Sequence, residues 1–241
     1  MNASRKVRLP NRDDLIDAAT AFATETPTVR GILLVGSYAR GEFTPRSDVD
    51  LLVLTARSTD IGQDAVKEFF RSHLEQHGLQ IQAVDVFVLD NKDLGPHSLF
   101  RRSAAHMRFL EADRGVPLWG EDFRSHLVPP PREAVLARVL DQVAELRDHP
   151  EEIDDRDVLL LATARMYAHT GTWPSKREAS EWDQHPAVAS AWQQRMKADE
   201  APTGSPAYAD YVRVVQDELE ACAKATGTGA GPSFDVRRDQ P

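Results

Sequence analysis

The chain has 241 residues, of which 41% are hydrophobic and 28% charged, a balance that predicts a folded globular protein rather than a disordered chain. Its formal net charge of −9 argues against a protein that binds duplex DNA or an anionic membrane through a basic surface. The single cysteine, Cys222, excludes an internal disulfide and a cysteine-rich zinc site.

The first part of the chain switches between helical and strand patterns. Residues 13–26 and 64–77 carry apolar side chains at helical spacing. Short apolar runs at residues 29–35, 49–55 and 80–89 predict three strands. The order helix, strand, strand, helix, strand predicts an α/β arrangement in an N-terminal domain over residues 1–95.

The pattern changes after residue 91, where no segment alternates as a strand does. Apolar residues recur at helical spacing in four stretches, at residues 99–110, 132–147, 157–170 and 208–225. We therefore expect an all-α domain over residues 96–225, which would bind the substrate. The glycine-rich, polar residues 226–241 predict a disordered tail.

A glycine–serine pair, Gly36-Ser37, follows the first predicted strand, and the acids Asp48 and Asp50 begin the second. Residues two apart in a strand face the same side, so the two carboxylates point the same way. Adjacent carboxylates repel each other, and their burial requires a compensating cation, for which Mg²⁺ is suited. The glycine lets a phosphate approach the backbone, and the Ser37 hydroxyl can bind it. Together these residues predict a triphosphate site beside two Mg²⁺ ions.

Asp85 is a lone acid in the apolar run of the third predicted strand, where an unpaired carboxylate is costly. It could simply reach solvent at the end of a strand. Its functional interpretation is that it completes the coordination of one metal and takes the proton from an incoming hydroxyl. Arg40, between the two motifs, could contact the triphosphate, although an exposed loop arginine needs no function.

The segment GSYARGEFTPRSDVDLLVL, with the later AVDVFVL, resembles the nucleotidyltransferase superfamily related to DNA polymerase beta over about residues 30–90. The resemblance implies a mixed sheet with helices on one side, and hence an α+β chain with an all-α second domain. It also implies two Mg²⁺ ions and transfer of a nucleoside monophosphate from a triphosphate to a hydroxyl, with release of pyrophosphate. By position, it assigns the roles as follows: Gly36 and Ser37 on the phosphates, Asp48 and Asp50 on both metals, and Asp85 on one metal and as the base.

Residues 154–182 are similar to the C-terminal domain of the aminoglycoside adenylyltransferases that modify streptomycin and spectinomycin. This similarity implies ATP as co-substrate, with Lys176 on its phosphates and Asp154 and Asp157 against an aminocyclitol. Residues 141–160 hold eight acids and two arginines, and carboxylates pair well with the ammonium or guanidinium groups of such a sugar. We therefore expect transfer of AMP to a hydroxyl of a small cationic acceptor, an aminoglycoside or aminocyclitol.

Other interpretations remain open at this stage. The phrase GSYARGE, followed by Ser-Asp, is also typical of minimal nucleotidyltransferases that act as antitoxins and add AMP to a partner toxin. A fused target of that kind would carry an Arg-x4-His motif, a spacing that Arg101 and His106 have. A degenerate nucleotide-binding scaffold is the non-enzyme alternative, and the intact acids argue against it. The sequence leaves open which acceptor is used, whether the co-substrate is ATP or another triphosphate, and whether the protein has a role in antibiotic resistance.

The segment MNASRKVRLP lacks the apolar stretch of a signal peptide, and no apolar run approaches the roughly 18 residues of a membrane span. We expect an unprocessed cytoplasmic enzyme with no nucleic-acid or membrane partner. The oligomeric state is open, with a monomer favoured.

Overall fold

A four-stranded mixed sheet organises the N-terminal half of the computed structural model, which describes residues 8–94, 108–197 and 203–225. The strands are β1 (Val29–Val35), β2 (Val49–Thr55), β3 (Val84–Leu89) and β4 (Val116–Gly120), in the spatial order β3-β2-β1-β4. β1 runs antiparallel to β2 and β4, whereas β2 and β3 are parallel. The predicted mixed sheet is confirmed.

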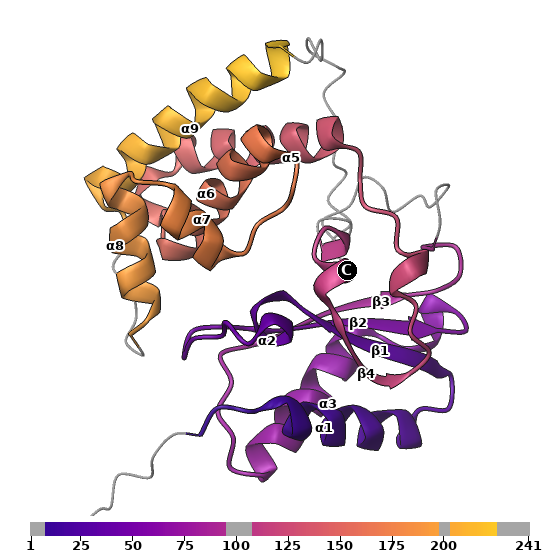
Figure 1. Ribbon diagram of the computed structural model, residues 1–241. Helices are drawn as coiled ribbons and strands as arrows, with labels where there is room; N and C mark the ends of the chain where they lie inside the picture. Colours follow the sequence, from indigo (N-terminus) through magenta and orange to yellow (C-terminus); the bar gives the residue numbers. More distant parts are fainter. Residues whose placement is uncertain (1–7, 95–107, 198–202, 226–241) are drawn as a thin grey trace, which may run out of the picture.

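Helices α1 (Arg12–Glu25) and α3 (Gln63–Gln76) cover one face of this sheet (Figure 1). Alternate residues of β2, such as Leu51 and Val53, pack against these helices because successive strand residues point to opposite faces. Leu52 and Leu54 point the other way, into a second cluster. Asp50 shares this second face, which lies on the side of the helical half (Figure 1).

The strand β4 lies where the sequence pattern predicts only helices, so that prediction is wrong there. Its sequence, VPLWG, is short and does not alternate. It pairs with β1 at the edge of the sheet, where a proline such as Pro117, which lacks an N–H, is tolerated. The sheet therefore takes a strand from beyond the predicted boundary at residue 95.

Helices make up the C-terminal half: α5 (Arg132–Asp148), α6 (Asp155–Thr170), α7 (Lys176–Trp182), α8 (Pro186–Arg195) and α9 (Pro206–Ala225). α6 lies at the centre of this half and is buried along most of its length. The predicted helices at 132–147, 157–170 and 208–225 are confirmed as α5, α6 and α9, whereas α7 and α8 were not predicted. Most of the predicted helix at 99–110 and the predicted tail at 226–241 lie outside the described residues.

Shorter helices connect these elements: the one-turn α2 (Gly36–Arg40) and the 3-10 helices Ser58–Asp60, Ala112–Arg114, Arg124–His126 and Pro150–Glu152. None of the helices within the described ranges is long and apolar enough to cross a membrane.

Buried ion pairs connect the two halves. Asp155, in the first turn of α6, has no exposed surface, and its carboxylate lies 2.8 Å from the Arg46 guanidinium of the loop before β2. Arg195, at the end of α8, is 3.7 Å from the same carboxylate. Loss of one partner of a buried pair leaves an uncompensated charge, so this cluster fixes how the halves sit against each other.

Candidate active site

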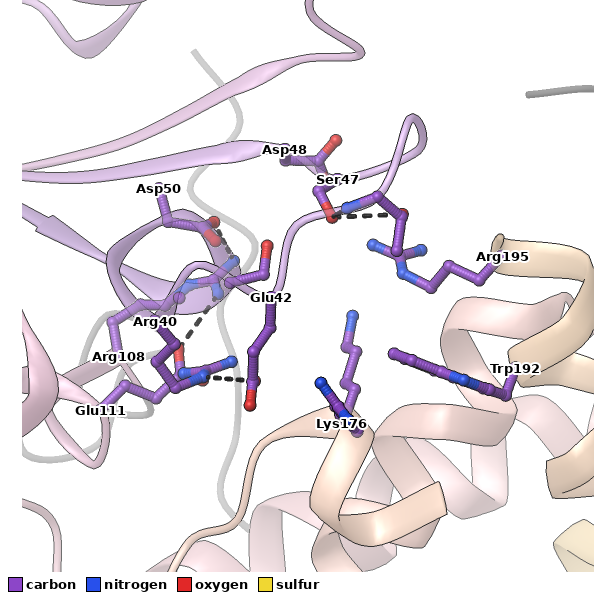
Figure 2. A pocket seen from close by; sticks show the side chains of 14 residues that line it. Arg40, Glu42, Ser47, Asp48, Asp50, Arg108, Glu111, Lys176, Trp192 and Arg195 are labelled. Carbon is purple, nitrogen blue, oxygen red and sulfur yellow. Dashed lines mark hydrogen bonds and ion pairs between the residues drawn. The ribbon is translucent and has the colours of Figure 1, made fainter. Parts of the chain in front are cut away.

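A pocket lies between the two halves. One wall comes from α2, the loop that follows it and the start of β2, and the opposite wall comes from α7 and α8. Figure 2 shows Asp48 and Asp50 on the sheet side, while Lys176, Trp192 and Arg195 project from the helical side. The pocket thus joins acidic groups of one half to basic groups of the other.

Gly36 begins α2 with a φ of 71°, a conformation that residues other than glycine rarely adopt. A Cβ at this position would lie 2.2 Å from Asp50 Oδ2. The structure therefore requires glycine because the start of α2 lies close to the Asp50 side chain, a reason additional to the predicted approach of a phosphate. Gly36 and Ser37 both line the pocket, next to the acids.

Three acids predicted to act together lie around the start of two neighbouring strands. Asp48 immediately precedes β2 and Asp50 lies within it, and both line the pocket. Asp85 is the register partner of Asp50 across the parallel β2–β3 ladder, so their side chains leave the same face. Asp85 is not among the described pocket-lining residues. One arginine contacts both Asp85 and Asp50.

That arginine is Arg108, which sequence reasoning did not single out. Its Nη2 lies 2.8 Å from Asp50 Oδ1 and donates a hydrogen bond of 3.0 Å to Asp85 Oδ2. Its Nη1 is 3.7 Å from Glu111 (Figure 2). Arg108 thus neutralises carboxylates that come from two strands.

Asp50 is buried, and this burial raises the pKa of its carboxyl to about 6, although nearby Arg108 acts in the opposite direction. Asp48 Oδ1 is buried and accepts no hydrogen bond from any described residue. Buried carboxylate oxygens without hydrogen-bond donors are suited to a hard divalent cation such as Mg²⁺. The residues present therefore fit the expected metal chemistry.

Lys176, the first residue of α7, lines the pocket on its basic side. Burial, with help from the charges of Arg195 and Arg108, lowers the pKa of its ammonium group to about 8. Burial also lowers the pKa of Arg195. Because the charged forms of Lys176 and Arg195 are disfavoured in the ligand-free pocket, both side chains are suited to an anionic ligand that would stabilise their charge.

Arg40 also lines the pocket, but its guanidinium is already paired. It lies 3.1 Å from Glu42 and 3.0 Å from Glu111, and it is only 11% exposed (Figure 2). To contact a triphosphate, as the sequence predicts, the Arg40 guanidinium would have to bind the phosphates while it stays paired with Glu42 and Glu111.

Asp154 and Asp157 form the capping box of α6. The Asp154 side chain accepts hydrogen bonds from the backbone N–H groups of Arg156 and Asp157, and Asp157 accepts one from the N–H of Asp154. Neither lines the pocket among the described residues. Both therefore have a structural role that the prediction of acceptor binding did not consider.

Sequence reasoning missed Arg108, Glu111, Trp192 and Arg195. All four line the pocket, and all come from segments without a recognisable motif. Trp192 is the tryptophan that faces the site, whereas Trp173 packs against Tyr167 in the helical core. A signal for Trp192 and Arg195 existed only in their helical spacing, since residues three apart share a face of α8.

Comparison with known families identifies the first part of the chain. Residues 15–106 match the family model described as nucleotidyltransferase domain. This confirms the resemblance drawn from the sequence. Among curated proteins no match was found.

Solved structures match the fold. The spectinomycin adenyltransferase AAD(9) from Enterococcus faecialis, solved with ATP and spectinomycin, superposes with a TM-score of 0.64 at 13% identity, over 88% of this chain and 100% of that one. At this identity the likeness shows the fold alone, and it extends over both halves.

Two further structures share less of the arrangement. A toxin–antitoxin structure with AMP-PNP covers 46% of this chain and 75% of that one, at 23% identity and a TM-score of 0.30. A nucleotidyltransferase-like protein from Exiguobacterium sibiricum covers 88% and 75%, at 16% identity and a TM-score of 0.30. Neither carries an argument about this chain.

Proposed function

We propose that the chain moves AMP from ATP to a hydroxyl of a small cationic acceptor, an aminoglycoside or aminocyclitol, because residues 15–106 match the family model described as nucleotidyltransferase domain. Pyrophosphate is the second product. The observation that carries the proposal is the pairing of Asp50 and Asp85 across the β2–β3 ladder, beside a pocket whose far wall holds Lys176 and Arg195.

The basic wall suits the triphosphate. Lys176 and Arg195 supply positive charge, and Ser37, whose hydroxyl can bind a phosphate, lines the same pocket from the sheet side. The indole of Trp192 lines the pocket beside Lys176 and offers a flat surface on which a nucleobase can stack (Figure 2). In this proposal the phosphates lie between the walls, and the base lies against α8.

The carboxylates carry the chemistry. Asp48 and Asp50 would hold two Mg²⁺ ions, with Asp85 on one of them. Bound there, Mg²⁺ would neutralise the charge that develops on the triphosphate during transfer. Asp85 is 37% exposed, which leaves its carboxylate accessible to an acceptor. The acceptor oxygen forms a bond to the α-phosphorus, the bond from that phosphorus to the bridging oxygen breaks, and Asp85 takes the hydroxyl proton.

Acidic groups around the pocket support a cationic acceptor. Asp154 and Asp157 are the residues that the family resemblance assigns to this task, and Glu42 adds a carboxylate that lines the pocket itself. Ammonium groups of an aminocyclitol would bind such carboxylates through charge-assisted hydrogen bonds. The solved AAD(9) structure, which holds ATP and spectinomycin, is consistent with this substrate class.

The proposal is tested by incubating the purified protein with MgATP and a panel of aminoglycosides that includes spectinomycin and streptomycin. Mass spectrometry should detect a product heavier by one AMP, formed only with Mg²⁺. The Asp48→Asn and Asp50→Asn double variant is the inactive control. No adenylylated sugar from any acceptor, together with AMP found on a co-expressed protein, would instead support the antitoxin interpretation.

A further inference from the structure

Arg108 lies between the two acids that a metal ion would bind. A single nitrogen, Nη2, is 2.8 Å from Asp50 Oδ1 and 3.0 Å from Asp85 Oδ2. The two acids are direct partners across neighbouring strands, which lie about 4.8 Å apart in a sheet. The guanidinium therefore sits at the point where one cation can reach both carboxylates.

The local electrostatics require a cation at this point. Asp50 is buried, and a buried carboxylate beside a second negative charge destabilises the fold if no cation compensates for it. Arg108 supplies the compensation. Because Asp50 Oδ1 accepts no geometrically well-formed hydrogen bond from the described residues, the ion pair with Arg108 is its main interaction.

We propose that Arg108 is an internal cation that takes the place of a divalent ion between Asp50 and Asp85 and gives way when the ion binds. This inference rests on the proposed function of the site. Mg²⁺ binds carboxylate oxygens at about 2.0–2.1 Å with strict geometry. A guanidinium nitrogen at 2.8 Å from the same oxygen cannot share that position with the ion, so the two cations compete.

Glu111 gives the displaced guanidinium a partner. It lies three residues after Arg108, and its Oε2 is 3.7 Å from Arg108 Nη1. Movement toward Glu111 would keep the guanidinium paired within the pocket after it leaves Asp50 and Asp85. Arg108 therefore neutralises the two carboxylates until the metal binds in its place.

The test measures Mn²⁺ binding without nucleotide, from the electron paramagnetic resonance signal of the free ion. R108A should bind Mn²⁺ about tenfold more tightly than the unaltered protein, because the competing cation is gone. R108K should lie between the two. Without metal, R108A should also melt at a lower temperature than the unaltered protein, and Mn²⁺ should raise its melting temperature by a larger interval.

Arg30→Ala is the matched control. Arg30 also bonds two side chains, Asn91 at 2.7 Å and Glu121 at 2.6 Å, and it is 38% exposed against 31% for Arg108. None of its partners is a candidate metal ligand, so its Mn²⁺ affinity should equal that of the unaltered protein.

If Arg108 only stabilised the local structure, the opposite result would be expected, because its loss would loosen the carboxylates and weaken Mn²⁺ binding. R108A with equal or weaker Mn²⁺ affinity overturns the proposal. Should R108A fail to fold, R108Q carries the same expectation, because it is neutral but retains a hydrogen-bond donor. The readout contains no nucleotide or acceptor. Failed AMP transfer with the expected Mn²⁺ pattern would therefore overturn the proposed function and leave the role of Arg108 standing.

Discussion

Asp50 and Asp85 are register partners on adjacent parallel strands, yet they differ in exposure: the side chain of Asp50 is 10% exposed and that of Asp85 is 37% exposed. The buried Asp50 carboxylate needs a neighbouring cation to stabilise its negative charge, whereas the exposed Asp85 carboxylate can contact a second substrate. This difference divides the proposed roles, with Asp50 as a metal ligand and Asp85 as the group that receives the proton.

Asp85→Asn should preserve nucleotide binding and remove most turnover. The amide keeps the shape of the side chain but cannot accept the hydroxyl proton, and loss of a general base costs roughly 10²–10⁴-fold. The measurement compares the rate of AMP transfer with the affinity for a non-hydrolysable ATP analogue. A near-normal rate would show that another group accepts the proton.

The affinity for the magnesium complex of the same analogue should fall as the pH rises from 7 to 9. Burial lowers the pKa of Lys176 to about 8 in the ligand-free protein, so the side chain is charged below that pH and neutral above it. The charged form binds phosphate, and binding above pH 8 should therefore take up a proton. Isothermal titration calorimetry in two buffers of different ionisation enthalpy measures both effects.

Two variants separate Lys176 from other titrating groups. Lys176→Arg keeps its charge throughout and should lose this pH dependence, whereas Lys176→Met should bind weakly at every pH. Lys176→Met should also raise the melting temperature of the ligand-free protein at pH 7, because the depressed pKa means that the charged lysine destabilises the fold there. This gain should shrink as the pH rises through about 8 toward 10. An unchanged pH profile in Lys176→Met would argue against this role.

Trp192→Ala should weaken ATP binding, while Trp192→Phe should retain most of it. Stacking of a base on an aromatic side chain contributes about 1–3 kcal/mol, and phenylalanine still offers a flat face. Trp173→Phe, a change in the helical core against Tyr167, is the control and should leave affinity unaltered. If Trp192→Ala binds the nucleotide as well as the unaltered protein does, the base lies elsewhere.

Asp154 requires a substitution that separates its two possible roles. Asp154→Asn keeps the N-cap hydrogen bonds of α6 but removes the charge, and Asp154→Ala removes both, at a cost of about 1 kcal/mol in stability. If the charge binds the acceptor, both variants should raise the KM for the acceptor and leave that for ATP unchanged. An unaltered KM in Asp154→Asn would limit Asp154 to capping.

The sequence allowed Asp48, Asp50 and Asp85 to be singled out because the patterns that mark these acids are local. The alternation around Asp50 and the lone acid of β3 each indicate which way a carboxylate points, and a parallel pairing of those strands brings them together.

Arg108 and Arg195 could not be predicted, because their importance arises from contacts between segments that no local pattern connects. The acids at the start of α6 differ in what the structure shows of them. The spacing of Asp154 and Asp157 is a capping signature, and the structure shows that capping role, while acceptor binding by the pair stays a prediction. Asp155 between them is the one that the fold buries against Arg46 and Arg195, and three acids in sequence do not reveal which of them faces inward.

The central claim is that Asp48, Asp50 and Asp85 bind the same divalent ions. The most direct measurement is the anomalous scattering of Mn²⁺ in crystals grown with a non-hydrolysable ATP analogue. We expect manganese peaks within coordination distance of all three carboxylates, with the triphosphate against Lys176. Manganese bound elsewhere, or Asp85 turned away from an occupied site, would contradict the account.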